Sequence, residues 1–195
     1  DENLLPIYQQ ALADPVEKKL IILHLIGTHP NYQERYPTTF NKFNSNSNDR
    51  VESDLKARNI DPWIRSLRND YDNAVLYEDH LLAKMLDTLR ADHLPDFRSF
   101  TVVSDHGNEV GHELDYAGHS PTTKAGYQVP VIMWSDKLNL TGVNKDTNLN
   151  TAELDQNLMH IMGLKDKSSS NHSYWLDQDY RFTPEANWPY WENKS

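Results

Sequence analysis

The sequence predicts an α/β fold, and three observations support this fold class. Two short apolar runs, residues 19–27 and 98–105, have the composition of strands. Between them, residues 62–91 place apolar side chains mostly three and four positions apart, which is the spacing of one helical face. A strand, a helix and a second strand form a crossover unit in which the two strands are parallel. Both strands would then end at one edge of the sheet, where ligands bind in open α/β folds.

The first part of the chain predicts a helix, a strand and a loop. Residues 3–13 are the expected helix, which stops at Asp14 because the residue before a proline avoids the helical region. Residues 19–27 are a nearly continuous run of leucine and isoleucine, typical of a strand buried on both faces. His24 lies inside that run, so we interpret it as a hydrogen-bonded core residue. Residues 28–49 are mostly polar and predict a long loop.

The second part predicts a long helix, two strands and a closing helix. Between positions 70 and 79, the helix at residues 62–91 carries a group of four acidic side chains that fall around several of its faces, which favours solvated or capping roles over catalysis. These residues are Asp70, Asp72, Glu78 and Asp79. The strand at 98–105 is followed by a third apolar run at 128–135, and residues 151–164 predict a helix that ends at Gly163.

Composition limits the classes of function. At 195 residues, the chain predicts one domain. Its 29 acidic and 19 basic residues give a net charge of -10, so we expect no nucleic acid as a partner, since nucleic-acid binding requires a basic face. The chain has no cysteine, which excludes disulfides and thiolate metal ligands. Any metal must therefore be bound by His, Asp, Glu or hydroxyl groups.

An Asp-His-Gly motif follows the second predicted strand. Asp105 and His106 lie where the strand ends, so both side chains can converge on one cation. A carboxylate oxygen and an imidazole nitrogen suit zinc or manganese, at about 2.0 to 2.2 Å. Gly107 is expected to let the chain turn away sharply. The competing interpretation is that Asp105 caps a following helix and that His106 is an ordinary loop residue.

Two further histidines are candidates for the same site. His29 ends the first predicted strand and would share the sheet edge with Asp105. His119 lies among small residues, which allow close approach to an ion or a phosphate. His112 competes with it but lies in a more charged stretch that suits solvent. We favour His119 over His112.

Five segments occur in one order along the chain. They are ILHLIGTHPNYQERYP (22–37), RNDYDNAVLYEDHLL (68–82), VVSDHGNEVG (102–111), GHSP (118–121) and QVPVIMW (128–134). Together they resemble the catalytic domain of the membrane-anchored bacterial phosphoethanolamine transferases, in the alkaline phosphatase/sulfatase superfamily. The resemblance implies a sulfatase-like central sheet with flanking helices. Residues 1–195 would be the C-terminal portion of that periplasmic domain, and thus an incomplete part of it.

The resemblance also implies an activity. Members of this family are zinc-dependent and transfer phosphoethanolamine from phosphatidylethanolamine to a core sugar or lipid A of lipopolysaccharide, at the periplasmic face of the inner membrane. The implied zinc ligands are Asp105 and His106, with a Glu and a nucleophilic Thr from earlier in the chain. His29 and His119 are the implied catalytic and substrate-binding residues, which handle the donor phosphate or a second zinc. Manganese would suit the site less well than one or two zinc ions.

The resemblance leaves alternatives open. The segments HLIGTH and GHSP are nearer to the core-sugar branch, and the absence of cysteine departs from the lipid A branch. A sulfatase or phosphodiesterase of the same superfamily, or a non-catalytic scaffold fragment, would share the motifs. We expect the nucleophile and the membrane anchor ahead of Asp1, and therefore expect the 195-residue chain alone to be inactive. Thr28, the nearest hydroxyl, is expected to be structural.

Overall fold

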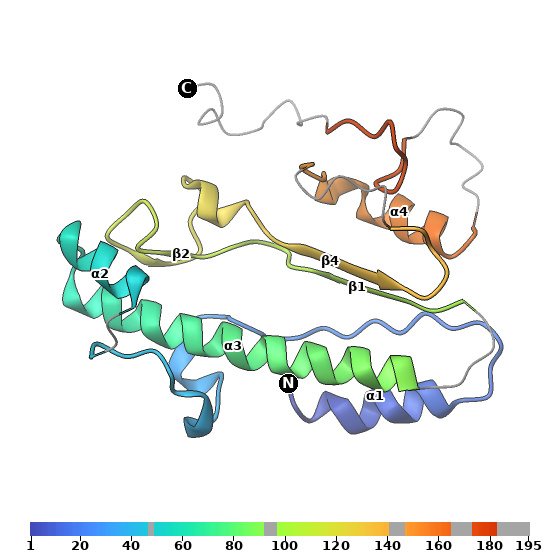
Figure 1. The fold of residues 1–195 in the computed structure, drawn as a ribbon, viewed down its shortest axis with the longest axis horizontal. Helices are drawn as coiled ribbons and strands as arrows, with labels where there is room; N and C mark the ends of the chain where they lie inside the picture. Colours follow the sequence, from blue (N-terminus) through green and yellow to red (C-terminus); the bar gives the residue numbers. More distant parts are fainter. Residues whose placement is uncertain (47–48, 92–96, 141–146, 165–172, 183–195) are drawn as a thin grey trace. The chain divides into compact units, whose positions relative to one another are not determined.

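The chain folds into two compact units in the computed structural model, which describes residues 1–46, 49–91, 97–140, 147–164 and 173–182. The first unit lies within Asp1–Pro95 and Val103–Pro130, and the second within Asp96–Val102 and Val131–Ser195. All four predicted site residues belong to the first unit. Figure 1 shows the elements of both units in chain order.

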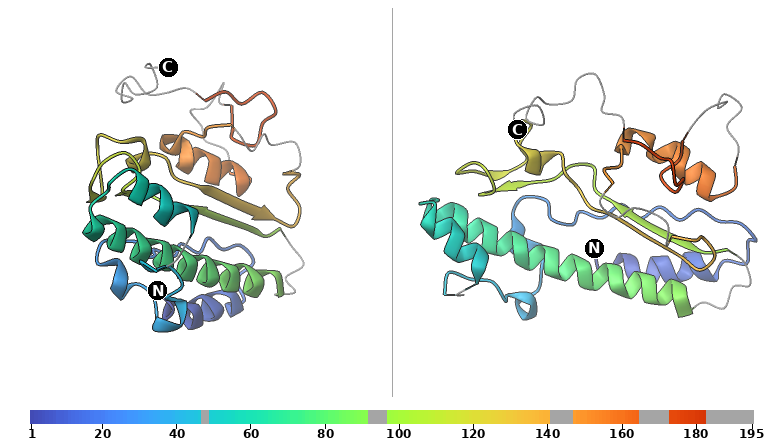
Figure 2. Two further views of the ribbon diagram at one scale, coloured as in Figure 1. Left: turned by 60° about the vertical axis from the view of Figure 1, so that its left-hand side comes forward. Right: turned by 45° about the horizontal axis from the view of Figure 1, so that its top comes forward.

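Helix α3, Pro62–Ala91, is the main element of the first unit and confirms the helix predicted at residues 62–91. Its apolar face is buried at Ala74, Leu81, Met85 and Leu89. Helix α1, Leu4–Ala13, contacts α3 and buries Tyr8 and Leu12, and it lies alongside α3 in Figures 1 and 2. The helix predicted at residues 3–13 is confirmed. The periodic burial of side chains therefore fixes these two helices together.

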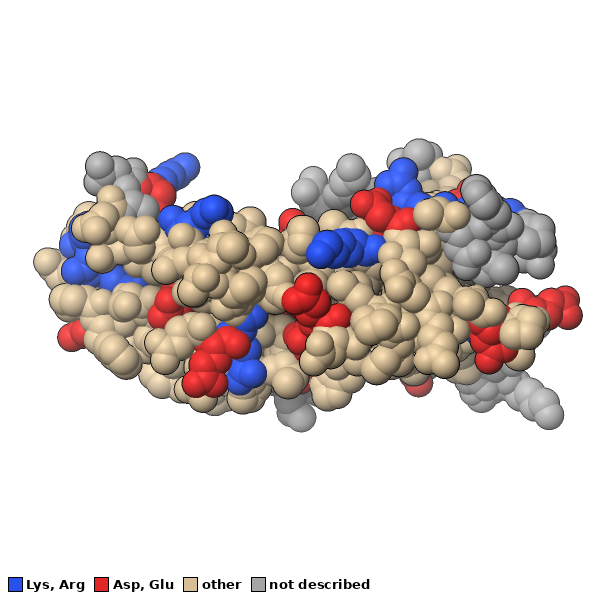
Figure 3. Space-filling view, turned by 90° about the horizontal axis from the view of Figure 1, so that it is seen from below, with Lys and Arg blue, Asp and Glu red and all other residues tan. Residues whose placement is uncertain are grey.

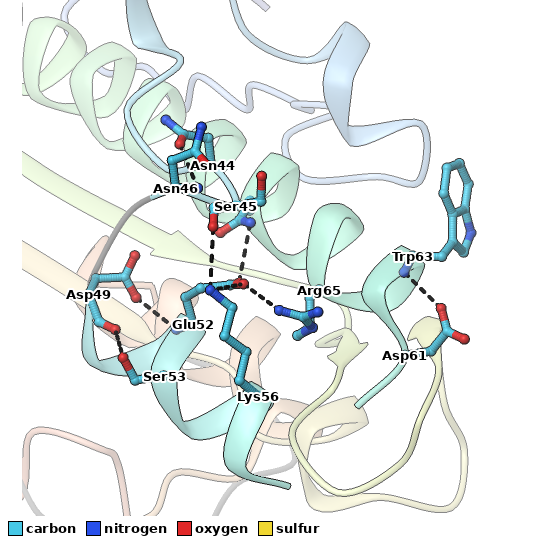
Figure 4. Close-up of polar contacts among 11 residues, drawn as sticks. Asn44, Ser45, Asn46, Asp49, Glu52, Ser53, Lys56, Asp61, Trp63 and Arg65 are labelled. Atoms are coloured by element: carbon cyan, nitrogen blue, oxygen red, sulfur yellow. Dashed lines mark hydrogen bonds and ion pairs between the residues drawn. The ribbon is translucent and has the colours of Figure 1, made fainter. Parts of the chain in front are cut away.

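Helix α2, Arg50–Ala57, was not predicted from the sequence. The Asp49 carboxylate caps it by accepting a hydrogen bond from the Glu52 backbone N–H at 2.8 Å. The Glu52 side chain is almost fully buried, and its Oε1 accepts from Nη1 of Arg65 on α3 at 2.6 Å. Lys56 Nζ lies 3.2 Å from the same oxygen, as Figure 4 shows. An ionic cluster thus attaches α2 to the start of α3.

The region predicted as a loop, residues 28–49, contains two short 3₁₀ helices, Tyr32–Glu34 and Thr38–Phe40. Asn73 of α3 holds the chain that follows them, because its Oδ1 accepts from the backbone N–H groups of Lys42 and Phe43 at 2.7 and 2.9 Å. The Asn73 side chain is fully buried. The polar loop is therefore fastened to α3 by backbone hydrogen bonds to one buried amide.

The strand predicted at residues 19–27 is wrong, because the structure assigns no strand there. Residues 20–26 instead run as a trace without strand pairing in which exposed and half-buried side chains alternate. His24 is on the exposed side, so its interpretation as a core residue is also wrong. The predicted parallel pair with the strand at 98–105 is therefore not formed. A strand requires a neighbouring backbone to hydrogen-bond with, and composition alone does not supply one.

The second unit contains strand β4, Val131–Ser135, and all but the last residue of strand β1, Ser99–Val103, and the two strands pair with each other. The backbone N–H of Asp136 donates to the Arg98 carbonyl at 3.2 Å, which brings the start of β1 next to the end of β4. These strands confirm the predictions at residues 98–105 and 128–135, although both are shorter than predicted.

The last helix lies in the same unit. It begins as a 3₁₀ turn, Thr151–Glu153, and continues as α4, Leu154–Ile161. Gly163 follows with a φ of 71°, the left-handed conformation expected where a helix ends. The buried Asn157 side chain accepts a hydrogen bond from the Trp175 backbone N–H at 2.7 Å. The helix predicted at residues 151–164 is thus confirmed.

A small hairpin belongs to the first unit. Strands β2, Glu109–Val110, and β3, Ala117–Gly118, pair antiparallel with Glu109 opposite Gly118. Two-residue strands are too short to be recognised from alternation. In the part of the chain that the structure describes, no helix combines the length and apolarity needed to cross a membrane. Acidic and basic side chains are interspersed on the face drawn in Figure 3.

Candidate functional site

The loop after β1 carries the Asp-His pair. Asp105 Oδ1 accepts from the His106 backbone N–H at 2.9 Å, and Asp105 Oδ2 lies 3.9 Å from His106 Nε2. His106 Nδ1 lies 3.0 Å from the Gly107 carbonyl oxygen. If Nδ1 donates to that carbonyl, Nε2 keeps its lone pair on the side of the Asp105 carboxylate. The Asp105 side chain is 85% exposed and the His106 side chain is 37% exposed. Asp105 Oδ2 and His106 Nε2 can therefore be reached from solvent.

The structure brings His119 next to this pair. The imidazole rings of His106 and His119 have centroids 4.2 Å apart, with 37° between their planes. The Tyr116 hydroxyl donates a hydrogen bond to the His119 carbonyl at 3.4 Å. Asp105, His106 and His119 therefore form one exposed cluster, although thirteen positions separate His106 from His119 in the sequence.

Two glycines hold the His106 and His119 loops together. The Gly107 backbone N–H donates to the Gly126 carbonyl at 3.0 Å. A Cβ atom on Gly107 would overlap the carbonyl oxygen of Ala125, and one on Gly126 would overlap the carbonyl oxygen of Ser120. Gly107 is not among the glycines with positive φ. Glycine is required at this position because two backbone segments approach closely.

His29 follows a tight turn at Gly27. Gly27 has a φ of 54°, and the His29 backbone N–H donates to the Ile26 carbonyl at 3.3 Å. The Asp1 carboxylate accepts from the backbone N–H groups of Ile26 and Gly27 at 3.0 and 2.7 Å. Arg35 Nε donates to the His29 carbonyl at 3.2 Å. Backbone contacts therefore fix this turn while the His29 side chain remains exposed.

Asn108 joins the His29 turn to the loop that carries His106. Its Nδ2 donates to the Thr28 carbonyl at 3.1 Å, and the residue is only 7% exposed. The two segments that were predicted to meet are thus adjacent. Among the described residues, however, no hydrogen bond or ion pair joins the His29 side chain to Asp105, His106 or His119.

Two ionisable side chains of α3 lie beneath the turn. Tyr71 lies close to the Thr28 side chain, and burial raises the pKa of Tyr71. The Glu78 carboxylate lies next to Gly27, and burial raises its pKa. The solvated or capping role predicted for Glu78 is therefore wrong. Tyr71 and Glu78 are seven positions apart, which places them on one face of the helix. This spacing was the sequence signal that both side chains could lie at the same turn.

His112 belongs to a different cluster. Its Nε2 lies 3.5 Å from Arg68 Nη1, and Arg58 Nη2 donates to the His112 carbonyl at 2.9 Å. Burial lowers the pKa of His112, and the Arg68 guanidinium lowers it further. Arg68 Nε also donates to both carboxylate oxygens of Asp72, at 2.8 and 3.0 Å. The structure therefore places His112 against α3 and places His119 against His106.

The donor atoms of Asp105 and His106 fit part of a zinc site. One carboxylate oxygen and one imidazole nitrogen are ordinary zinc ligands. Within the described ranges, no three His, Asp or Glu side chains are arranged so that they could bind one metal ion. Because zinc sites normally use at least three protein ligands, this pair would need further ligands to complete the coordination.

Comparison with known proteins shows what the chain is similar to. Residues 1–164 match the Sulfatase family. Phosphoethanolamine transferase EptC of Escherichia coli K12 is 37% identical over 141 residues, which is 70% of this chain and 23% of that protein. Phosphoethanolamine transferase CptA of Salmonella typhimurium is 35% identical over 141 residues, with the same shares. A Kdo(2)-lipid A phosphoethanolamine 7''-transferase of Salmonella typhimurium is 32% identical over 142 residues. The chain spans about a quarter of the length of these relatives (23%).

Proposed function

The chain belongs to the sulfatase family, and from this premise we propose that it is part of a phosphoethanolamine transferase. The proposed enzyme moves phosphoethanolamine from phosphatidylethanolamine to lipopolysaccharide, on either a core sugar or lipid A. The observation that carries the proposal is the cluster of Asp105, His106 and His119 beside the His29 turn. The names of the relatives support the transferred group, and one of those names includes lipid A.

Each residue of the cluster has a proposed role. Asp105 and His106 would hold zinc, which when bound stabilises negative charge on phosphoryl oxygen and favours loss of a proton from a hydroxyl. His29 and His119 would bind the donor phosphate. One of them would deliver a proton to the diacylglycerol oxygen as its bond to phosphorus breaks. Imidazole suits this role because its pKa lies near neutral pH.

The nucleophile is proposed to come from outside the described cluster. The new bond forms between its hydroxyl oxygen and phosphorus, and the acceptor sugar then displaces it. Thr28 is a poor candidate, because its carbonyl accepts a hydrogen bond from the buried Asn108 side chain and Tyr71 of α3 lies close to its side chain. We therefore propose that Thr28 is structural. We further propose that the enzyme acts at the periplasmic face of the inner membrane, where both lipid substrates are accessible.

A hydrolase is the second candidate, and membership of the sulfatase family favours it. A hydrolase would use the same cluster but pass the phosphoryl group to water. The two candidates therefore differ in the product and not in the residues required.

The test is a transfer assay on the protein as its gene encodes it. The assay supplies phosphatidylethanolamine labelled in the headgroup, lipopolysaccharide and zinc. Label should appear on lipopolysaccharide with the wild type, and the rate should fall at least about a hundredfold with Asp105→Ala because a charged metal ligand is lost. Asp87→Ala, an exposed aspartate of α3, is the matched control and should retain full activity.

Two outcomes would contradict the proposal. Transfer that is undiminished in Asp105→Ala would show that the cluster does not carry the reaction. Release of free phosphoethanolamine by the wild type, without label on lipopolysaccharide, would identify a hydrolase.

A further inference from the structure

We propose that Asn108 is a positioning residue, which sets the place of His29 relative to His106. The inference rests on the proposed function, because it assigns to Asn108 an effect on catalysis that acts through His29. Asn108 itself would not touch the substrate. Its side chain would instead keep two loops in one arrangement, so that both histidines face the same phosphate.

The first argument is the hydrogen bond between the loops. Asn108 lies two residues after His106, and its Nδ2 donates to the carbonyl of Thr28, which immediately precedes His29. Among the described residues, no other hydrogen bond joins residues 26–30 to residues 104–108. The contacts that Asp1 and Arg35 make with the His29 turn do not involve the His106 loop. The relative position of the two histidines therefore depends on this amide.

The second argument is burial. Asn108 is 7% exposed, and its Oδ1 is a buried atom without a hydrogen-bond partner in the structure. An unpaired buried carbonyl oxygen lowers the stability of the folded state. An apolar side chain at this position would avoid that cost but could not donate to Thr28. The Asn108 side-chain amide thus lowers stability through its carbonyl oxygen, and only its N–H group forms a hydrogen bond. Such a residue is expected where the reaction depends on the position of the neighbouring loop.

The third argument is the rigidity of the surroundings. Gly107 is packed against the carbonyl oxygen of Ala125, so the residue before Asn108 cannot shift freely. Asn108 is followed by Glu109, which is fully buried at the start of β2. The amide is therefore held from both sides. It provides a fixed point for Thr28, and displacing a catalytic group by about 1 Å can cost a hundredfold in rate.

The experiment is a double-mutant cycle on the protein as its gene encodes it, measured by transfer of labelled phosphoethanolamine to lipopolysaccharide. Asn108→Ala should lower kcat at least about tenfold, in the range found for supporting residues of metal sites. His29→Ala should lower it further. In the His29→Ala background, Asn108→Ala should have no additional effect, because the group that it positions is gone.

The control is Asn69→Ala, which removes another buried asparagine whose Nδ2 lies 3.5 Å from Glu52. It should lower the melting temperature as Asn108→Ala does but leave kcat unchanged. Should Asn108→Ala fail to fold, Asn108→Ser, which retains a hydroxyl but is too short to reach Thr28, takes its place in the cycle.

The outcomes separate the two proposals. Full activity of Asn108→Ala, or an equal loss of kcat on adding Asn108→Ala to the wild type and to His29→Ala, would overturn the positioning role of Asn108. Neither outcome would affect the proposed function. Full activity of His29→Ala, or no transfer by the wild type, would instead count against the proposed function. Loss of kcat in Asn69→Ala as large as in Asn108→Ala would show a general effect of buried asparagines and overturn the positioning role.

Discussion

At the scale of single residues, Gly27 determines the turn that leads to His29. Its φ of 54° lies in the left-handed region, and a Cβ atom there would lie 2.8 Å from both carboxylate oxygens of Glu78. Two penalties therefore oppose any other residue at this position. The larger is the backbone conformation, and the smaller is displacement of the Glu78 carboxylate, which is the end of a flexible but half-buried side chain.

Gly27→Ala should lower the free energy of unfolding by more than the backbone term alone, which is about 1 to 2 kcal/mol for a left-handed residue. Urea titration measures the difference. Gly163→Ala is a matched control, because Gly163 has a φ of 71° and no atom within 4 Å of an added Cβ. In a Glu78→Ala background the cost of Gly27→Ala should decrease to that of Gly163→Ala. An unchanged cost in that background would show that Glu78 does not restrict the turn.

Glu78 gives a prediction for pH. Burial raises its pKa, so the folded state binds a proton more readily than the unfolded state and loses stability as the pH rises through the raised pKa. Glu78→Gln removes the buried charge and should raise the melting temperature at neutral pH. The gain should shrink as the pH falls through the raised pKa, and it should disappear below about 4.3, the ordinary pKa of glutamate, where the carboxyl group is protonated in both states.

Asp79→Asn serves as the control for that comparison, because Asp79 is an exposed neighbour on the same helix. Its effect on stability should stay within about 0.5 kcal/mol at every pH. A gain for Glu78→Gln that does not depend on pH would contradict the assigned cause.

At the scale of elements, the attachment of α2 to α3 depends on a buried carboxylate. Glu52 accepts from Arg65 at 2.6 Å, and the Glu52 side chain is only 1% exposed. Lys56 shares the same oxygen but is itself half exposed. Arg65 is therefore the main partner of a charge that would otherwise be buried without compensation.

Arg65→Ala should lower the free energy of unfolding by about 3 kcal/mol, the low end for breaking a buried ion pair, because Lys56 remains. Arg90→Ala, in an exposed pair with Asp87 at 3.8 Å, should cost less than about 1 kcal/mol. Chemical denaturation measures the loss in both variants. Equal and small losses in the two variants would show that Glu52 does not depend on Arg65.

The elements also show what could be predicted from the sequence. Helix α3 was predicted because its apolar spacing reflects the face that it buries, and the end of α1 was predicted from the proline that follows Asp14. Helix α2 was missed because its eight residues include only two large apolar side chains, and an Asp cap and an ionic cluster stabilise it instead. Residues 19–27 were predicted as a strand from composition, but strand formation depends on pairing with a distant segment.

At the scale of the whole molecule, the candidate site combines loops that are far apart in the sequence. The adjacency of the His29 turn and the Asp105–His106 loop was predicted from a pair of parallel strands that the structure does not contain, and the choice of His119 over His112 from its small neighbouring residues. The contacts that produce the adjacency could not be predicted, because they are a hydrogen bond from the Asn108 side chain and the close packing of Gly107 and Glu78. Close approach of two backbones leaves no periodic signal in a sequence.

The central claim is that Asp105 and His106 bind the zinc on which transfer depends. It is tested most directly by titrating the metal-free protein, as its gene encodes it, with zinc. The wild type should bind zinc tightly, and Asp105→Ala should bind it at least about tenfold more weakly, since even residues that only support metal ligands contribute this much. Asp87→Ala should match the wild type. Equal zinc affinity and stoichiometry in the wild type and Asp105→Ala would contradict the account.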